Sequence, residues 1–213
     1  MCSSDLITRD AIVTAAFAVL DDAGLDGLTV RAVADRLDVK APALYWHVHD
    51  KQELLDEMGT RVWAQVADAT SAQPQDTWRD ALARYARVAR RALLEHRDGA
   101  RVFSGTYLTD PGVLQRQESG LAWMERQGFT VDATVDAYGI VTSFVIGHCI
   151  EEQARAQAPD DRYALAARDR RVDASRHPRV AASGRRIFQG EADARFDGLL
   201  AIVLDGVEAN RPG

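Results

Sequence analysis

Side chains suited to contacting nucleic acid are concentrated in one short stretch near the N-terminus. Tyr45, Trp46 and His47 stand in a row on a segment too small to bury them all, so these rings are expected to meet a partner. Unpaired N–H groups at the start of a helix favour a phosphate, and the sequence predicts such a start at Lys51. Positive charge lies close by, on Arg31, Arg36, Lys40 and Lys51.

A helix-turn-helix pattern positions these residues. Val30, Val33, Ala34 and Leu37 recur at the spacing of one helical face, and Thr29 is a good N-cap for that helix. A polar interruption at residues 38–40 then separates it from a second short helix.

The second helix is expected from Ala41 to about His47, with Pro42 in its first turn, where the missing N–H costs nothing. Asp50 and Glu53 form a capping-box-like start for the helix that follows. The three helices together predict a compact DNA-reading unit.

Composition favours an all-α protein. The 213 residues are 46% hydrophobic, with six prolines and no sustained alternation of β-branched residues. The two cysteines predict neither a disulfide framework nor a metal site, and no cofactor is expected. No apolar run of membrane-span length and no signal peptide are evident, so the expected location is the cytoplasm. The net charge of −6 requires any DNA contact to be local.

The chain is predicted to divide at residues 71–76. Residues 1–70 would form an N-terminal three-helix DNA-binding domain with the helix-turn-helix, extended by a linker helix over 51–69. Residues 71–213 would form a larger helical domain. Its helices are expected over 77–95, 113–126, 130–156, 178–188 and 192–210, with a loop over 157–177 that leaves room for a short helix near Tyr163 to Arg171.

Two helices of the larger domain carry more apolar surface than one subunit needs. No Asp, Glu, Lys or Arg occurs between Asp136 and Glu151. Helices 130–155 and 192–210 therefore predict a homodimer interface, the alternative being that they pack within one subunit. A two-fold dimer would read a roughly palindromic operator.

The whole chain resembles the tetracycline repressor family. The segment LTVRAVADRLDVKAPALYWHVHDKQELLD is similar to that family's DNA-binding domain. The segments ALLEHRDGARVFSGT, LAWMERQGF, FVIGHCIEEQ and FDGLLAIVLDGVE resemble its ligand-binding and dimerisation body. The resemblance implies a homodimeric repressor that binds a double-stranded DNA operator and is released by a small-molecule inducer.

The resemblance also implies which residues contact DNA. Arg31 would read a base, and an arginine can bind guanine through two hydrogen bonds. Ala41 and Ala43 stand where the tetracycline repressor has polar base-reading side chains, so a different operator sequence is expected. The implied DNA-binding residues are Thr29, Arg31, Pro42, Ala43, Tyr45, Trp46, His47 and Lys51.

The expected pocket departs from that of the tetracycline repressor. Phe103 replaces the histidine that binds the drug's magnesium, and Gly120 replaces a glutamine, whereas Thr106 and Glu151 match. One acid does not make a magnesium site, so a flatter, more apolar or aromatic ligand is expected. Plain core packing is the alternative role of each aromatic residue. The candidate ligand-binding residues are Ala67, Tyr85, Ala89, Phe103, Thr106, Tyr107, Leu121, Trp123, Tyr138, Thr142 and Glu151.

Three other functions fit parts of the sequence. His148, Glu151 and Glu152 lie one turn apart and could share a metal in an enzyme, but no second matching pair appears. No phosphate loop or nucleophile elbow is evident, so an enzyme is not expected. An architectural DNA-binding protein would not need so large a body. An activator with the same fold stays open, because activation depends on where the operator lies.

Overall fold

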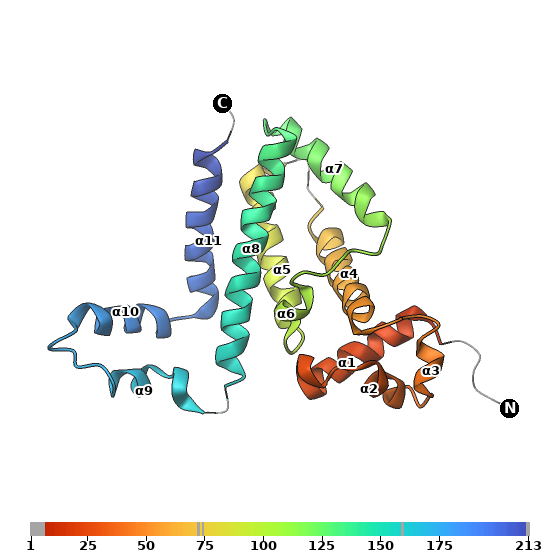
Figure 1. The fold of residues 1–213 in the computed structure, drawn as a ribbon. Helices are drawn as coiled ribbons and strands as arrows, with labels where there is room; N and C mark the ends of the chain where they lie inside the picture. Colours follow the sequence, from red (N-terminus) through yellow and green to blue (C-terminus); the bar gives the residue numbers. More distant parts are fainter. Residues whose placement is uncertain (1–6, 72, 74, 159, 212–213) are drawn as a thin grey trace.

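The protein is built from helices. The computed structural model describes residues 7–71, 73, 75–158 and 160–211, and every regular element within them is helical, which confirms the all-α prediction (Figure 1). The elements are α1 (Arg9–Gly27), α2 (Val30–Arg36), α3 (Ala41–Leu44), α4 (Lys51–Ala69), α5 (Trp78–Leu94), α6 (Gly99–Phe103), α7 (Gly112–Arg126), α8 (Val131–Ala156), the 3-10 turn η1 (Asp161–Tyr163), α9 (Leu165–Asp169), α10 (Pro178–Phe188) and α11 (Ala192–Ala209).

The first three helices and the start of α4 enclose a small apolar core, and we call this unit the head. Ile12 and Leu20 of α1, Val33 of α2, Leu44 of α3 and Leu54 of α4 are all fully buried. Each helix therefore contributes its apolar face to one centre, which leaves the polar faces of α2 and α3 directed outward.

Side-chain caps begin most of the long helices, as the sequence predicts. The hydroxyl groups of Thr8, Thr29, Thr77 and Thr130 each accept a hydrogen bond from a backbone N–H in the first turn of α1, α2, α5 and α8. Asp50 does the same for α4. Such a cap contributes about 1 kcal/mol to a helix start, so local sequence alone places these boundaries.

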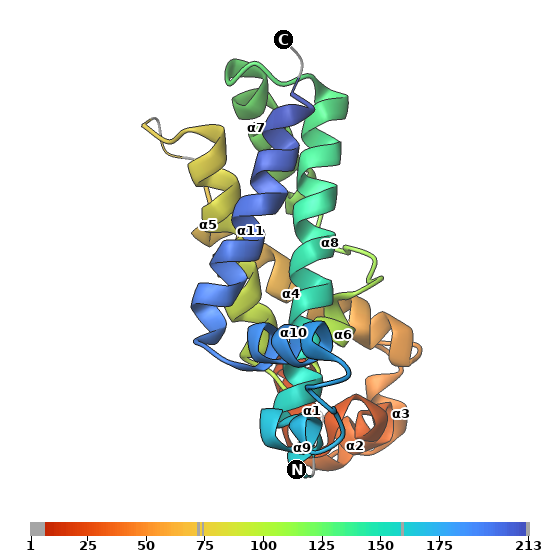
Figure 2. The same cartoon turned by 90° about the vertical axis from the view of Figure 1, so that its left-hand side faces the viewer.

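The remaining helices form a larger body around α5 and α8. Helix α5 packs against α4, α6, α8 and α11, and α7 packs against α8. Helices α8 and α11 run side by side in opposite directions, and α9 and α10 project from the far end of α8 (Figures 1 and 2). Helix α4 has one end in the head and the other against α5, so it physically joins the two parts.

One predicted helix is shorter in the structure than expected. Helix α3 ends at Leu44, because the N–H groups of His47 and Val48 both donate to the Leu44 carbonyl and tighten the last turn. The segment 157–177, predicted as a loop with room for a short helix near Tyr163 to Arg171, contains η1 and the short helix α9 at that place. Ala72 and Pro74, within the predicted domain boundary, lie outside the described residues.

Helix α8 meets the length and composition criterion of a membrane span, contrary to the prediction that no segment would. Within the described residues it is the one helix that does so. Core helices of soluble proteins meet the same criterion, and α8 packs against α5, α6, α7 and α11. Only 28% of the most apolar 18-residue stretch of α8 is buried, so most of that stretch is not packed against other helices of the same subunit.

A buried ion pair ties the three central helices of the body together. Arg90 of α5 is 8% exposed and donates two hydrogen bonds to Glu152 of α8, at 2.9 and 2.7 Å. A third bond of 2.6 Å reaches Asp193 of α11, and the guanidinium lies 5.0 Å from the ring centroid of Phe196. The hydrogen bonds to Glu152 and Asp193 raise the pKa of Arg90 against the opposing effect of burial.

Replacing Arg90 by Ala is expected to lower the free energy of unfolding by about 2 kcal/mol. Loss of one partner from a fully buried pair costs about 3–5 kcal/mol, and the cost here is smaller because Glu152 is partly exposed and Asp193 is largely exposed. Arg87→Ala is the control, because Arg87 and its partner Asp197 are both exposed and such pairs contribute at most about 1 kcal/mol. Urea unfolding at one fixed protein concentration measures both; equal losses would contradict a special role for Arg90.

Candidate DNA-contacting face and ligand pocket

The head presents two large aromatic side chains to solvent. Trp46 is 87% exposed, and Tyr45 beside it is also exposed, although both directly follow the buried Leu44. Arg31 and Pro42 are exposed on the adjoining helices, while Ala43 and His47 are half-buried. Rings of this size on the outside of a small helical unit are suited to a partner surface.

Two of the predicted DNA contacts are already engaged within the head. The Thr29 hydroxyl accepts a 3.1 Å hydrogen bond from the N–H of Ala32, so it serves α2 as its cap. The Lys51 ammonium donates to the carbonyl of Leu25 at 2.7 Å and thereby holds the end of α1 against the start of α4. An ammonium group has three donors, so Lys51 retains two for another acceptor.

An aromatic cluster fills the space between α4, α5, α6 and α8. Tyr85 of α5 lies at its centre, 5.7 Å from Trp63 and 5.3 Å from Tyr138 between ring centroids. Trp63 also lies 5.6 Å from Phe103. The Tyr85 hydroxyl hydrogen-bonds with the Thr142 hydroxyl at 2.7 Å, and burial raises the pKa of Tyr85. The structure thus places four of the residues predicted for the pocket side by side: Tyr85, Phe103, Tyr138 and Thr142.

Trp63 completes this cluster and was not among the predicted pocket residues. On the linker helix it is adjacent to the apolar face of Met58, Val62 and Val66, and it carries no polar signal of its own. Only the packing of α4 against α5 and α6 shows that it points at Tyr85 and Phe103. The one clue in the sequence is a tryptophan on the helix that links the two predicted domains.

The other predicted pocket residues differ in how far their side chains are buried. Ala89 and Trp123 are buried, and Ala67, Thr106 and Leu121 are half-buried. Tyr107 is 76% exposed, so within this subunit it does not line a pocket, contrary to the prediction. Glu151 is also exposed and faces Arg155 at 3.5 Å.

The three residues considered for a metal site do not converge. The Nε2 atom of His148 lies 3.8 Å from Glu152, and both Glu152 oxygens already accept hydrogen bonds from Arg90. Glu151 points to solvent. Burial lowers the pKa of His148, which packs against Phe144 and Phe196. Within the described part of the chain, no group of three or more His, Cys, Asp or Glu residues is placed to hold a metal ion.

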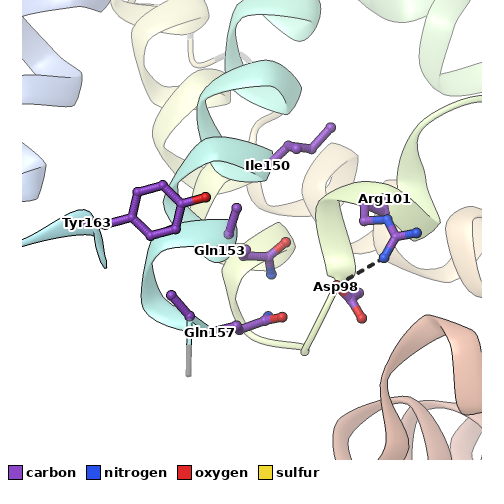
Figure 3. Close-up of a pocket in the computed structure, with 8 residues that line it drawn as sticks. Asp98, Arg101, Ile150, Gln153, Gln157 and Tyr163 are labelled. Carbon is purple, nitrogen blue, oxygen red and sulfur yellow. Dashed lines mark ion pairs between the residues drawn. The ribbon is translucent and has the colours of Figure 1, made fainter. Parts of the chain in front are cut away.

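Two clefts open at the end of α8 nearest the head, on either side of Gln153. One has a volume of about 330 Å³ and is lined by polar and apolar groups, including Asp98, Arg101, Ile150 and Tyr163 (Figure 3). The other, of about 280 Å³, is bordered by the turn between α5 and α6. Neither includes a residue of the aromatic cluster.

The turn between α5 and α6 connects the body to the head. The buried Gln153 amide donates to the carbonyls of Leu93 and His96 and accepts from the N–H of Ala100. On the other side of the turn, His96 stacks on Phe17 of α1 with ring centroids 4.2 Å apart. The head therefore contacts the body through this turn as well as through α4.

Comparisons with known proteins agree on one family over nearly the whole chain. A family model described as bacterial regulatory proteins, tetR family, matches residues 12–58, and one described as tetracyclin repressor-like, C-terminal domain, matches residues 70–211. The tetracycline repressor protein class C of Escherichia coli is 32% identical over 96% of this chain and 92% of that protein.

Two solved structures from Streptomyces coelicolor are also similar. A possible TetR family transcriptional regulator is 36% identical with a TM-score of 0.83, over 96% of this chain and 100% of that one. The TetR family protein ActR, in complex with actinorhodin, is 26% identical with a TM-score of 0.80, over 96% and 98% of the two chains.

Replacing Tyr85 by Phe is expected to cost about 1 kcal/mol of stability, because the Thr142 hydroxyl loses its partner while the ring stays in place. Tyr138→Phe is the matched control, since no hydrogen bond of the Tyr138 hydroxyl exists among the described residues. That change should cost less than about 0.5 kcal/mol. Thermal unfolding followed by circular dichroism measures both, and the same loss for each variant would contradict the role given to the Tyr85 hydroxyl.

Proposed function

Since the chain belongs to the tetracycline repressor family of transcriptional regulators, we propose that it is a homodimeric repressor released from its operator by a small aromatic ligand. The observation that carries this proposal is the position of Trp63. It lies on α4, the helix that extends from the head, and its ring contacts Tyr85 and Phe103 of the body. A molecule that separates these rings must displace α4.

The head supplies the proposed operator contacts. Exposed Arg31, Pro42, Tyr45 and Trp46 lie on α2 and α3 and on the turn after α3, with Ala43 and His47 beside them. Lys51 would hold a phosphate with the donors that Leu25 leaves free. Thr29 would act indirectly, by fixing the first turn of α2. The division into a DNA-binding part, 1–70, and a ligand-binding and dimerisation part, 71–213, belongs to this proposal.

A homodimer through α8 and α11 is supported by their uncovered apolar faces. Val131, Val135 and Ile140 of α8 are exposed, and Ile202 of α11 is 67% exposed. Open space surrounds the glycines of both helices, so a second pair of helices could approach closely. Four such helices would bury these side chains, and the two-fold axis would present two heads to a palindromic operator.

The ligand is proposed to occupy the aromatic cluster without a magnesium ion. A related TetR protein has been solved in complex with minocycline, and ActR has been solved in complex with actinorhodin, so the family accepts different ligands. In this chain Phe103 contributes a ring where the resemblance expects a metal-binding histidine, and Glu151 is exposed. Rings at 5.3–5.7 Å from one another would stack on the faces and edges of a flat ligand.

Release from DNA follows from a difference in ligand affinity between two arrangements of the heads. The free dimer samples several head separations, and DNA selects one of them. A ligand that binds another arrangement better by about 3 kcal/mol would weaken DNA binding on the order of 100-fold. The proposal includes a cytoplasmic location. An activator of the same fold would use the same contacts, with the operator placed differently.

Arg31→Ala is expected to weaken operator binding about 10- to 100-fold, since one good base contact contributes about 1–3 kcal/mol. Arg36→Ala is the control on the same helix, because Arg36 is held by Asp22 at 2.6 Å and should change affinity less than about two-fold. Fluorescence anisotropy with DNA from upstream of the protein's own gene measures both. Loss of operator binding in both variants would show that the positive charge of α2 matters and that Arg31 makes no specific base contact.

Phe103→Ala is expected to reduce the response to ligand about two- to ten-fold, because an aromatic contact contributes about 0.5–1.5 kcal/mol. Tyr107→Ala should leave the response unchanged, since that ring lies outside the cluster. The measurement is release of labelled operator by a panel of tetracyclines and other planar natural products, with and without magnesium. Submicromolar tetracycline binding that requires magnesium would contradict the proposed ligand class.

A further inference from the structure

The head carries too little free positive charge to hold DNA strongly by itself. Residues 1–70, which comprise the head and the rest of α4, contain twelve acidic and six basic residues. Their net charge of −6 equals the net charge of the whole chain. Phosphate binding depends on Lys and Arg, and each phosphate contact displaces bound counterions. An acidic head therefore repels the DNA that its recognition helix must approach.

Most basic residues of the head are also committed to partners within it. Arg9, Arg36 and Arg61 each form an ion pair with a carboxylate of the head, and Lys51 donates to a backbone carbonyl. Among the described residues, the basic side chains of the head that have no such partner are Arg31 and Lys40.

A second segment carries the opposite charge. Residues 161–188, comprising η1, α9 and α10, contain eight arginines and three aspartates, a net charge of +5, and we call them the arginine arm. Six of its arginines are exposed, and no side chain or carbonyl among the described residues pairs with their guanidinium groups. These six are Arg170, Arg171, Arg176, Arg179, Arg185 and Arg186.

The arm is an ordered unit with little contact to the rest of its own chain. Arg168 joins its two helices by donating to the carbonyl of Val180 at 2.9 Å and by lying 5.9 Å from the Phe188 ring centroid. Gly184 allows this contact, because a β-carbon there would collide with the Arg168 guanidinium. Arg168 therefore shapes the arm, and the six exposed arginines are free to act on something else.

The arm occupies the same end of the molecule as the head. In both views α9 and α10 lie at the level of α1–α3, on the opposite side of α8 (Figures 1 and 2). This is the side of α8 and α11 that the proposed dimer covers. The arms of a dimer would therefore lie between its two heads, above the centre of an operator.

We propose that the arginine arm is a second DNA-binding element, which contacts phosphates between the two half-sites. This inference rests on the proposed function. The arm provides the positive charge that the head lacks, at the end of the molecule where DNA must lie. Arginine binds phosphate through two parallel hydrogen bonds, and such contacts strengthen binding without reading sequence.

The test removes arm charges and measures the salt dependence of operator binding. The variant is Arg170→Gln, Arg171→Gln, Arg185→Gln and Arg186→Gln combined, and the probe is a labelled fragment that the wild-type protein selects from a randomised DNA pool. If each subunit loses one phosphate contact, the slope of log K against log salt should fall in magnitude by about 1.8. Affinity at 150 mM salt should fall ten-fold or more.

The control removes charges at positions far from the arm. Arg91→Gln with Arg126→Gln alters two exposed arginines of α5 and α7 that have no ion-pair partner among the described residues, and its slope should match the wild type. Hydroxyl-radical footprinting gives a second readout: the wild type should protect the backbone between the half-sites, and the arm variant should not. Thermal unfolding verifies that the arm variant is folded.

Two results would overturn the proposal. An unchanged slope and footprint in the folded arm variant would show that the arm does not contact DNA. Weaker dimerisation in that variant, by analytical ultracentrifugation, with an unchanged slope would place the arm on the partner's acidic head instead. Failure of the wild-type protein to select any DNA would be a different result, because it would contradict the proposed function itself.

Discussion

The buried amide of Gln153 determines how the head is carried on the body. Its three hydrogen bonds hold the turn between α5 and α6. The same turn contacts α1 in two ways: His96 stacks on Phe17, and the Asp98 carboxylate accepts a hydrogen bond from the N–H of Leu25. A buried amide with all these partners cannot shift without leaving polar groups unpaired. The head therefore has one fixed support at this turn and one through α4.

Two supports of this kind constrain how the proposed ligand would move the head. If the turn stays fixed by Gln153, a displacement of α4 at Trp63 becomes a rotation of the head about the turn and not a simple translation. Helix α4 also meets the body at Gly59, where a β-carbon would collide with the side chain of Thr106. The close approach at Gly59 lets the loop after α6 lie directly on α4, so the pocket region and the linking helix touch at more than one point.

The sequence predicts local features of this fold well and tertiary ones less well. Thr29, Asp50 and Thr130 are recognisable as caps because the signal lies within a few residues. The row from Tyr45 to His47 is recognisable for the same reason. Trp63, by contrast, joins the aromatic cluster only because α4 packs against α5 and α6, and Tyr107 lies outside it because its side chain faces solvent. The arginine arm is visible as composition, but its position at the level of the head, across α8, depends on the direction in which α8 ends.

The acidic head has a consequence for how many copies of the regulator a cell would need. Genomic DNA offers a very large number of non-specific sites, and a protein with a basic surface is spread over them. A head with a net charge of −6 would add little to binding at such sites, so fewer of the molecules would be held there than of a protein with a basic head. A small number of dimers would then occupy a single operator, and a modest amount of ligand would titrate them.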